Sequence, residues 1–230
     1  MGHVATRGSD STVQPGGAAA PRRRAGLSQE RSRDTRRRLV RAAMALWTER
    51  GFETGVEDTT IDEIVQAAGV TKGTFYFHFA HKEEIFLELG YQTAATLADE
   101  ARRCVAAERA VDDSLRRLVS TLARSVRNTS PAAVGRAMAE FYRPYKPGAK
   151  PPASLLSFAD ALGLVFERAQ ERAEVTAQVP AAEMAQIVEA LFVDSLREWA
   201  QGRQKQLNAS LQQRTAIVLA GLRPDNPLWS

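Results

Sequence analysis

The side chains from Thr71 to His78 carry the functional groups best suited to chemistry in this 230-residue chain. The surrounding stretch, AAGVTKGTFYFHF, places two hydroxyls, an ammonium, a phenol and an imidazole close together. Such groups donate hydrogen bonds to phosphate oxygens and to the edges of nucleic-acid bases. A binding surface is therefore one interpretation of the stretch, and a packed aromatic helix is the other.

Residue types that perform catalysis are not combined here into a recognisable set. The histidines His3, His78 and His81 have no cysteine or carboxylate at metal-site spacing. The sequence has no glycine-rich phosphate loop and no nucleophile elbow. The single cysteine, Cys104, cannot form an internal disulfide and suits a small buried apolar residue better than a redox sensor. We therefore expect a protein that is not an enzyme and needs no metal or cofactor.

Positive charge is concentrated in the first part of the chain. Residues 1–50 contain 11 Lys and Arg against 4 Asp and Glu, whereas the remainder contains 20 against 23. This asymmetry favours a polyanionic partner such as nucleic acid, and a solvated charged tail is the alternative. Residues 1–32 mix Pro, Gly, Ala and Arg with few apolar side chains, which predicts a disordered basic arm.

The arginines of this arm have two possible roles on DNA. They could enter the minor groove, or they could attract phosphates without sequence preference, which we favour. The residues concerned are Arg22–Arg24, Arg31, Arg33 and Arg36–Arg38.

Two short helices separated by a glycine must position the polar side chains. Thr60 followed by Glu63 fits a capping box that opens the first of them. Gly69 suits a left-handed stop, and Thr71 can cap a second helix that runs to about Phe79. A helix, a glycine corner and a second helix form a helix-turn-helix, whose second helix lies in the major groove with its first residues against base edges.

The side chains of the second helix divide between two faces. Phe75 and Phe79 lie four residues apart and predict a core-facing stripe. Tyr76 lies on another face, where its hydroxyl can reach a phosphate. Lys72 suits a phosphate or a guanine edge, and Thr74 suits a base edge or a thymine methyl group.

The remaining sequence is also helical in pattern. One helix is expected from about Asp34 to Gly51, a loop over residues 53–59, and a long helix from Lys82 to about Ala107. Further apolar stripes at helical spacing follow, and none of the sequence shows sustained strand alternation. We expect an all-α fold of about nine helices, with no membrane span and a cytoplasmic location.

The stretch TTIDEIVQAAGVTKGTFYFHFAHKEEIFLEL resembles the DNA-binding signature of the TetR family of bacterial transcriptional regulators, and RRLVRAAMALWTERGF resembles its first helix. The resemblance covers about Arg36–Leu89. It implies a three-helix DNA-binding domain with a helix-turn-helix over residues 33–81, and an effector-binding and dimerisation domain over residues 82–225. By position, the family's DNA contacts fall on Thr60, Thr71, Lys72, Gly73, Thr74, Tyr76, His78 and Lys82.

Three features depart from the family pattern. The loop over residues 53–59 looks longer than usual, and Val65 stands where the family often has Ala. His81 replaces the usual Ser or Asn before the fourth helix of the family, and imidazole is a weaker cap.

The carboxyl-terminal helices of the family form a homodimer and hold an effector pocket. Candidates for the pocket, which suggest an apolar or aromatic effector, are Met138, Phe141, Tyr142, Phe158, Leu162, Phe166 and Phe192. Candidates for the dimer interface are Leu191, Leu196, Trp199, Val218, Leu219 and Leu222. For every residue in both sets the alternative is ordinary core within one chain.

The resemblance implies a nucleoid-associated repressor that binds a palindromic DNA operator as a homodimer and is released by a small-molecule effector. The alternatives are a helical scaffold and a DNA-binding protein regulated by a protein partner.

Overall fold

The computed structural model describes residues 2, 20–52, 54–127, 129–141 and 157–229, and all regular structure in these residues is helical. The α-helices are α1 (Ala20–Arg50), α2 (Gly55–Asp58), α3 (Ile61–Ala68), α4 (Lys72–His78), α5 (Leu87–Ala106), α6 (Val111–Arg127), α7 (Pro131–Phe141), α8 (Phe158–Glu171), α9 (Ala181–Ala200) and α10 (Leu207–Gly221). Two 3-10 helices, η1 (Lys82–Phe86) and η2 (Pro227–Trp229), complete the described part. None of these helices has the length and apolar character needed to cross a lipid bilayer.

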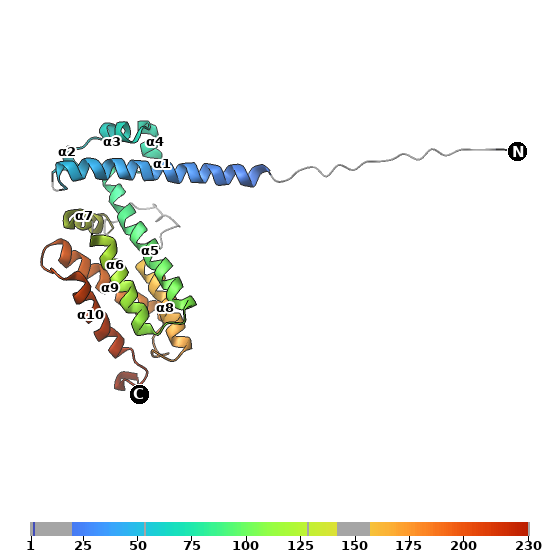
Figure 1. Cartoon of the computed structure of the whole chain (residues 1–230), viewed down its shortest axis with the longest axis vertical. Coiled ribbons are helices and arrows are strands. Elements are labelled where there is room, and N and C mark those ends of the chain that lie inside the picture. Colours follow the sequence, from blue (N-terminus) through green and yellow to red (C-terminus); the bar gives the residue numbers. More distant parts are fainter. Residues whose placement is uncertain (1, 3–19, 53, 128, 142–156, 230) are drawn as a thin grey trace.

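The helices form two packed units. In Figure 1, α3 and α4 lie on one side of α1, and α5 leads away from α1 on the other side into a helical bundle. We call α1 to α4 with η1 the N-terminal unit, and α5, α6 and α8 to α10 the helical body. The shape places the short helices α3 and α4 at one end of the molecule, remote from the carboxyl terminus.

Aromatic side chains hold the N-terminal unit together. Trp47 of α1 stacks on Phe86 of η1, with ring centroids 4.6 Å apart, and both side chains are buried. Phe75 of α4 and Phe79, the C-cap of that helix, are also buried in this cluster, which confirms their predicted core role. Each such ring contributes roughly 1.5–3 kcal/mol through burial. Because η1 packs here, this cluster extends past residue 81, where we predicted the domain to end.

The first helix begins earlier than the sequence predicted. Residues 1–32 were expected to be disordered, but α1 starts at Ala20 and is continuous to Arg50. Four of residues 20–32 are arginine and two are alanine, which favour helix, and Pro21 is tolerated in a first helical turn. The prediction is therefore corrected for residues 20–32, and residues 3–19 lie outside the described part.

A short helix, α2, replaces part of the predicted loop over residues 53–59. The backbone N–H of Gly55 donates to the carbonyl of Gly51 at 2.9 Å. A Cβ atom at Gly55 would lie 2.5 Å from Cβ of Arg50, so only glycine permits this close approach. The extra helix therefore depends on a contact with α1 that periodicity does not reveal.

Candidate nucleic-acid interface

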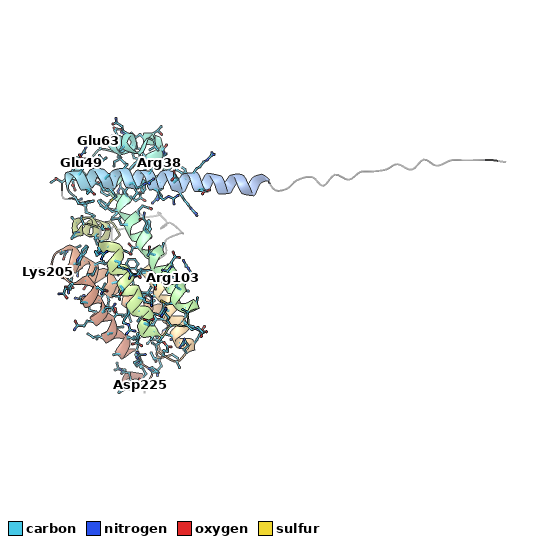
Figure 2. All side chains as sticks on the ribbon, viewed as in Figure 1. Arg38, Glu49, Glu63, Arg103, Lys205 and Asp225 are labelled. Carbon is cyan, nitrogen blue, oxygen red and sulfur yellow. The ribbon has the colours of Figure 1, made fainter. Side chains whose placement is uncertain are left out.

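The start of α3 is fixed by a complete capping box. The backbone N–H of Glu63 donates to Oγ1 of Thr60 at 3.3 Å, and Oε2 of Glu63 accepts from the backbone N–H of Thr60 at 2.7 Å. Arg50 donates to Oε1 of the same carboxylate at 2.6 Å. The hydrogen bonds that the Glu63 carboxylate accepts, that of Arg50 first, lower its pKa to about 2. The first helix of the helix-turn-helix is thus anchored to α1 by an ionised carboxylate, and Figure 2 shows Glu63 on the α3 side of α1.

The corner between α3 and α4 has the predicted geometry. Gly69 has a φ of 63°, in the left-handed region, and its backbone N–H donates to the carbonyl of Gln66. Thr71 caps α4, because its Oγ1 accepts from the backbone N–H of Thr74 at 3.2 Å. The hydroxyls of Thr71 and Thr74 also lie 2.9 Å apart. Both predicted caps are confirmed, and the turn presents two hydroxyls at the start of α4.

The outer face of α4 is aromatic and exposed. Tyr76 is 53% exposed and Phe77 is 79% exposed, while the neighbouring Phe75 is fully buried. The predicted contact set omitted Phe77. Helical spacing could have identified it, because position 77 lies about 200° around the helix from the core-facing position 75. The face that would enter a groove therefore includes the apolar ring of Phe77 as well as the phenol of Tyr76.

Lys72 forms an ion pair in the free protein. Its Nζ lies 3.0 Å from Oδ2 of Asp62 on α3, and both side chains are mostly exposed. The hydrogen bond with Asp62 raises the pKa of Lys72. Gly73 is exposed, and an added Cβ would meet only the Thr71 hydroxyl, at 3.9 Å. Backbone and ammonium are therefore both accessible to a phosphate at this turn.

His78 and Lys82 lie closer to the interior than the first turn of α4. The carbonyl of His78 accepts from Nη1 of Arg36 at 2.7 Å, and burial, followed by the charge of Arg36, lowers the pKa of its imidazole. The Nζ of Lys82 donates to the carbonyls of Glu57 and Thr59 at 2.8 and 2.7 Å. Lys82 therefore supports the segment that leads into α3, and only its third N–H remains for a phosphate.

His81 provides no side-chain cap for η1, in line with its weak capping chemistry. Its Nε2 lies 3.4 Å from Oε1 of Glu140 on α7, and its Nδ1 lies 3.3 Å from Oε2 of Glu83. The imidazole thus connects the segment between α4 and η1 to α7.

A cavity of about 290 Å³ lies in the helical body, next to α7. Of the predicted pocket residues, Met138 and Phe158 line it, while Leu162, Phe166 and Phe192 are packed into the body's core. Tyr142 and the side chain of Phe141 lie outside the described part. The described lining combines apolar side chains with neutral polar ones and includes no charged residue; its polar members are Gln92, Thr93, Thr96, Ser125 and Thr129.

The predicted dimer residues divide into two groups. Leu196, Leu219 and Leu222 are buried within the chain's own core and have little surface left for another copy. Leu191, Trp199 and Val218 are half-buried. The most exposed large apolar side chains on α9 and α10 were not in the predicted set; they are Ile187, 44% exposed, and Ile217, 65% exposed.

The chain is similar to known regulators over two different spans. The family model described as "Bacterial regulatory proteins, tetR family" matches residues 39–89. HTH-type transcriptional regulator TcmR of Streptomyces glaucescens is 40% identical over 76 residues, which are 33% of this chain and 30% of TcmR. The match thus spans less than a third of that relative's length.

Two further similarities extend into the helical body. The A-factor receptor protein of Streptomyces griseus is 32% identical over 167 residues, 71% of this chain and 54% of the receptor. The crystal structure of Thermus thermophilus FadR, a TetR-family repressor in complex with lauroyl-CoA, superposes with a TM-score of 0.68 and 27% identity. That superposition covers 84% of this chain and 97% of FadR.

Proposed function

Since this chain belongs to the TetR family of bacterial transcriptional regulators, we propose that it is a homodimeric repressor of a palindromic operator, released from DNA by a small-molecule effector. Residues 33–81 would bind DNA, and residues 82–225 would bind the effector and dimerise. The protein would act in the cytoplasm, at the nucleoid.

The observation that carries the proposal is the exposed start and outer face of α4. A helix with only structural duties would cover its aromatic rings, but Tyr76 and Phe77 face outward beside the polar turn at Thr71 and Lys72. Phe75 and Phe79 meanwhile lock the opposite face into the core, so the helix is rigidly presented. This combination suits major-groove reading by the first turn and phosphate or thymine-methyl contacts by the rings.

Dimerisation is supported by the apolar surface of the last two long helices. Ile187 and Ile217 expose large side chains on α9 and α10, and Leu191 and Val218 are half-buried. A second copy seated on these helices would form a four-helix bundle and bury that surface. It would also present two α4 helices to successive turns of the major groove.

The effector would occupy the cavity beside α7. The described lining suits a ligand with an apolar body and a few neutral hydrogen-bonding groups, which could meet Gln92, Thr93 and Thr96. FadR was solved with lauroyl-CoA, so an acyl chain is one apolar body that such a fold accommodates. A cavity of about 290 Å³ is near the lower end of ligand pockets and fits a short chain or a single small ring system. A thermal-shift screen in which only highly charged compounds bind would contradict this choice.

The direct test is selection of bound duplexes from random DNA by the full-length protein. We expect a palindromic sequence, with binding weakened by Lys72→Ala and by Tyr76→Phe in gel-shift titrations. Extracts of candidate metabolites added to the bound complex should then release it. A protein that selects no DNA, and instead captures a tight protein partner, would support the scaffold alternative.

A further inference from the structure

Helix α7 is shared between the two cores of the molecule. Ala133 and Ala137 are buried in the aromatic cluster of the N-terminal unit, whereas Val134 is buried in the core of the helical body. Met138 packs against the body and, like Ala137, lines the cavity. Figure 1 shows α7 between α1 and the top of the bundle. The position of α7 therefore depends on both units at once.

Arg136 extends from α7 to the N-terminal unit. Its Nε donates to the carbonyl of Phe52 at 2.8 Å, and its Nη1 and Nη2 donate to Oε1 and Oε2 of Glu57 at 2.8 and 3.1 Å. The hydrogen bond from Arg136 is the main cause of a lowered pKa at Glu57, which favours the ionised carboxylate. A bidentate arginine–carboxylate pair of this kind fixes the orientation of the two side chains as well as their distance.

The helix that Arg136 holds, α2, leads directly into the helix-turn-helix. Glu57 is in α2, and Thr60, two residues after the end of α2, is the cap of α3. Lys82, the first residue of η1, donates to the carbonyls of Glu57 and Thr59. The segment is thus held from α7 on one side and from η1 on the other.

These contacts add a separate attachment of the N-terminal unit to the body. One route is the continuous chain from η1 into α5, beside which Arg36 of α1 donates to Glu88 of α5 at 2.6 Å. The other route is the docking of α7, where Arg136 makes directional bonds to Phe52 and Glu57. Because this second route lies away from α5, it restricts pivoting of the unit about the start of α5. We propose that Arg136 is a positioning residue that fixes the angle between the helix-turn-helix and the body, and so sets the half-site spacing that a dimer accepts.

The inference rests on the proposed function, since it assumes a dimer on a palindrome. Base preference depends on side chains at the start of α4, whereas the hydrogen bonds of Arg136 given above go to Phe52 and Glu57. Half-site spacing depends on the separation and orientation of two α4 helices, which follow from the angle of each unit to the body. Loss of Arg136 should therefore change spacing tolerance and leave base preference intact.

The test uses the half-site that the full-length wild-type protein selects from random DNA. Duplexes carry two copies of it at the selected spacing, or with one and two base pairs added or removed. Affinities are measured for wild type, Arg136→Met, Arg136→Lys and Glu57→Gln. Arg168→Met is the matched control, because Arg168 is 34% exposed against 30% for Arg136 and pairs with Glu171 and Glu108, both outside the N-terminal unit.

For wild type and Arg168→Met we expect one strongly preferred spacing. Arg136→Met should reduce the ratio of affinities between that spacing and its neighbours by about fivefold or more, the lower end of ordinary coupling between sites. Glu57→Gln should also reduce this ratio of affinities, and because Glu57 is exposed it serves as the test if Arg136→Met does not fold. The ratio for Arg136→Lys should lie between those of wild type and Arg136→Met.

An unchanged spacing profile in folded Arg136→Met or Glu57→Gln would overturn the inference, even if overall affinity drops. Loss of an ion pair that only stabilises the fold would lower the affinity for duplexes of every spacing by the same factor. An equal change in Arg168→Met would overturn it too. Failure of the wild type to select any DNA would instead contradict the proposed function.

Discussion

At the scale of single residues, the ring of Phe77 is the feature that packing explains least. It is 79% exposed, although an aromatic ring stabilises a fold only when it is covered. We expect Phe77→Ser to change stability by no more than about 0.5 kcal/mol and to weaken binding of the selected duplex by about tenfold. Thermal unfolding and fluorescence anisotropy measure the two effects. In contrast, Phe75→Ala should cost about 3–5 kcal/mol of stability. A large stability loss from Phe77→Ser would show that its role is packing.

Glu63 leads to a prediction about how the stability of the protein depends on pH. Its pKa is lowered from 4.5 to about 2 in the folded protein, chiefly by Arg50. A group with a lowered folded pKa contributes stability above its unfolded pKa and loses it as the pH falls toward the folded value. Between about pH 5 and pH 2, wild type should therefore lose more thermal stability than Glu63→Gln, so that the two unfolding temperatures converge. A gap that widens on acidification would contradict this assignment, and Glu84→Gln supplies an acidic control outside the α3 cap.

At the scale of elements, what could be predicted from the sequence depends on how local the chemistry is. The caps Thr60, Thr71 and Gly69 act on residues within three or four positions, so their spacing identified α3, α4 and the corner between them. The contact of Arg136 with Glu57 joins residues 79 apart, and periodicity carries no signal for it. The α2 helix escaped prediction for the same reason.

The roles of apolar side chains were harder to predict from the sequence than those of polar ones. The same leucines and phenylalanines suit a cavity wall, a dimer face or a core, and only packing distinguishes the three. Phe166 and Phe192 proved to be core, whereas Met138 lines the cavity. Around α4 the sequence predicted part of the pattern of buried and exposed rings, because Phe75 and Phe79 share one face. The exposure of Phe77 was not predicted.

The outer faces of α9 and α10 supply the element-scale prediction. If these helices form the dimer interface, Ile217→Glu places a charge where two copies meet, and burying an unpaired charge is unfavourable. We expect monomers in sedimentation velocity with the helical content retained in circular dichroism. Leu228→Glu is the control, because Leu228 is 74% exposed and lies in η2, outside both helices. A variant Ile217→Glu that remains a dimer would place the interface elsewhere.

At the scale of the whole molecule, charge is distributed as a basic end joined to a slightly acidic remainder. The first 50 residues carry a net charge of +7 and the other 180 carry −3, so attraction to DNA is concentrated in the part of the chain that ends with α1. Within α1, Arg37 and Arg38 are exposed and lie 4.0 Å from their shared partner Asp34. Such loosely paired arginines can exchange a carboxylate for a phosphate with little loss.

Deleting residues 1–30 removes Arg7, Arg22–Arg24 and the part of α1 up to residue 30, and leaves α3 and α4 untouched. Each phosphate that an arginine no longer neutralises lowers the steepness of log K against log salt by about 0.9, so both affinity at low salt and the slope should decrease. The selected operator sequence should stay the same, because attraction to phosphates carries no base information. Substituting the four arginines by Gln in the full-length chain is the matched variant, since it removes their charge and keeps the chain length and all of α1. If either protein selects a different sequence, the arm reads the minor groove, and the recognition surface extends beyond α4.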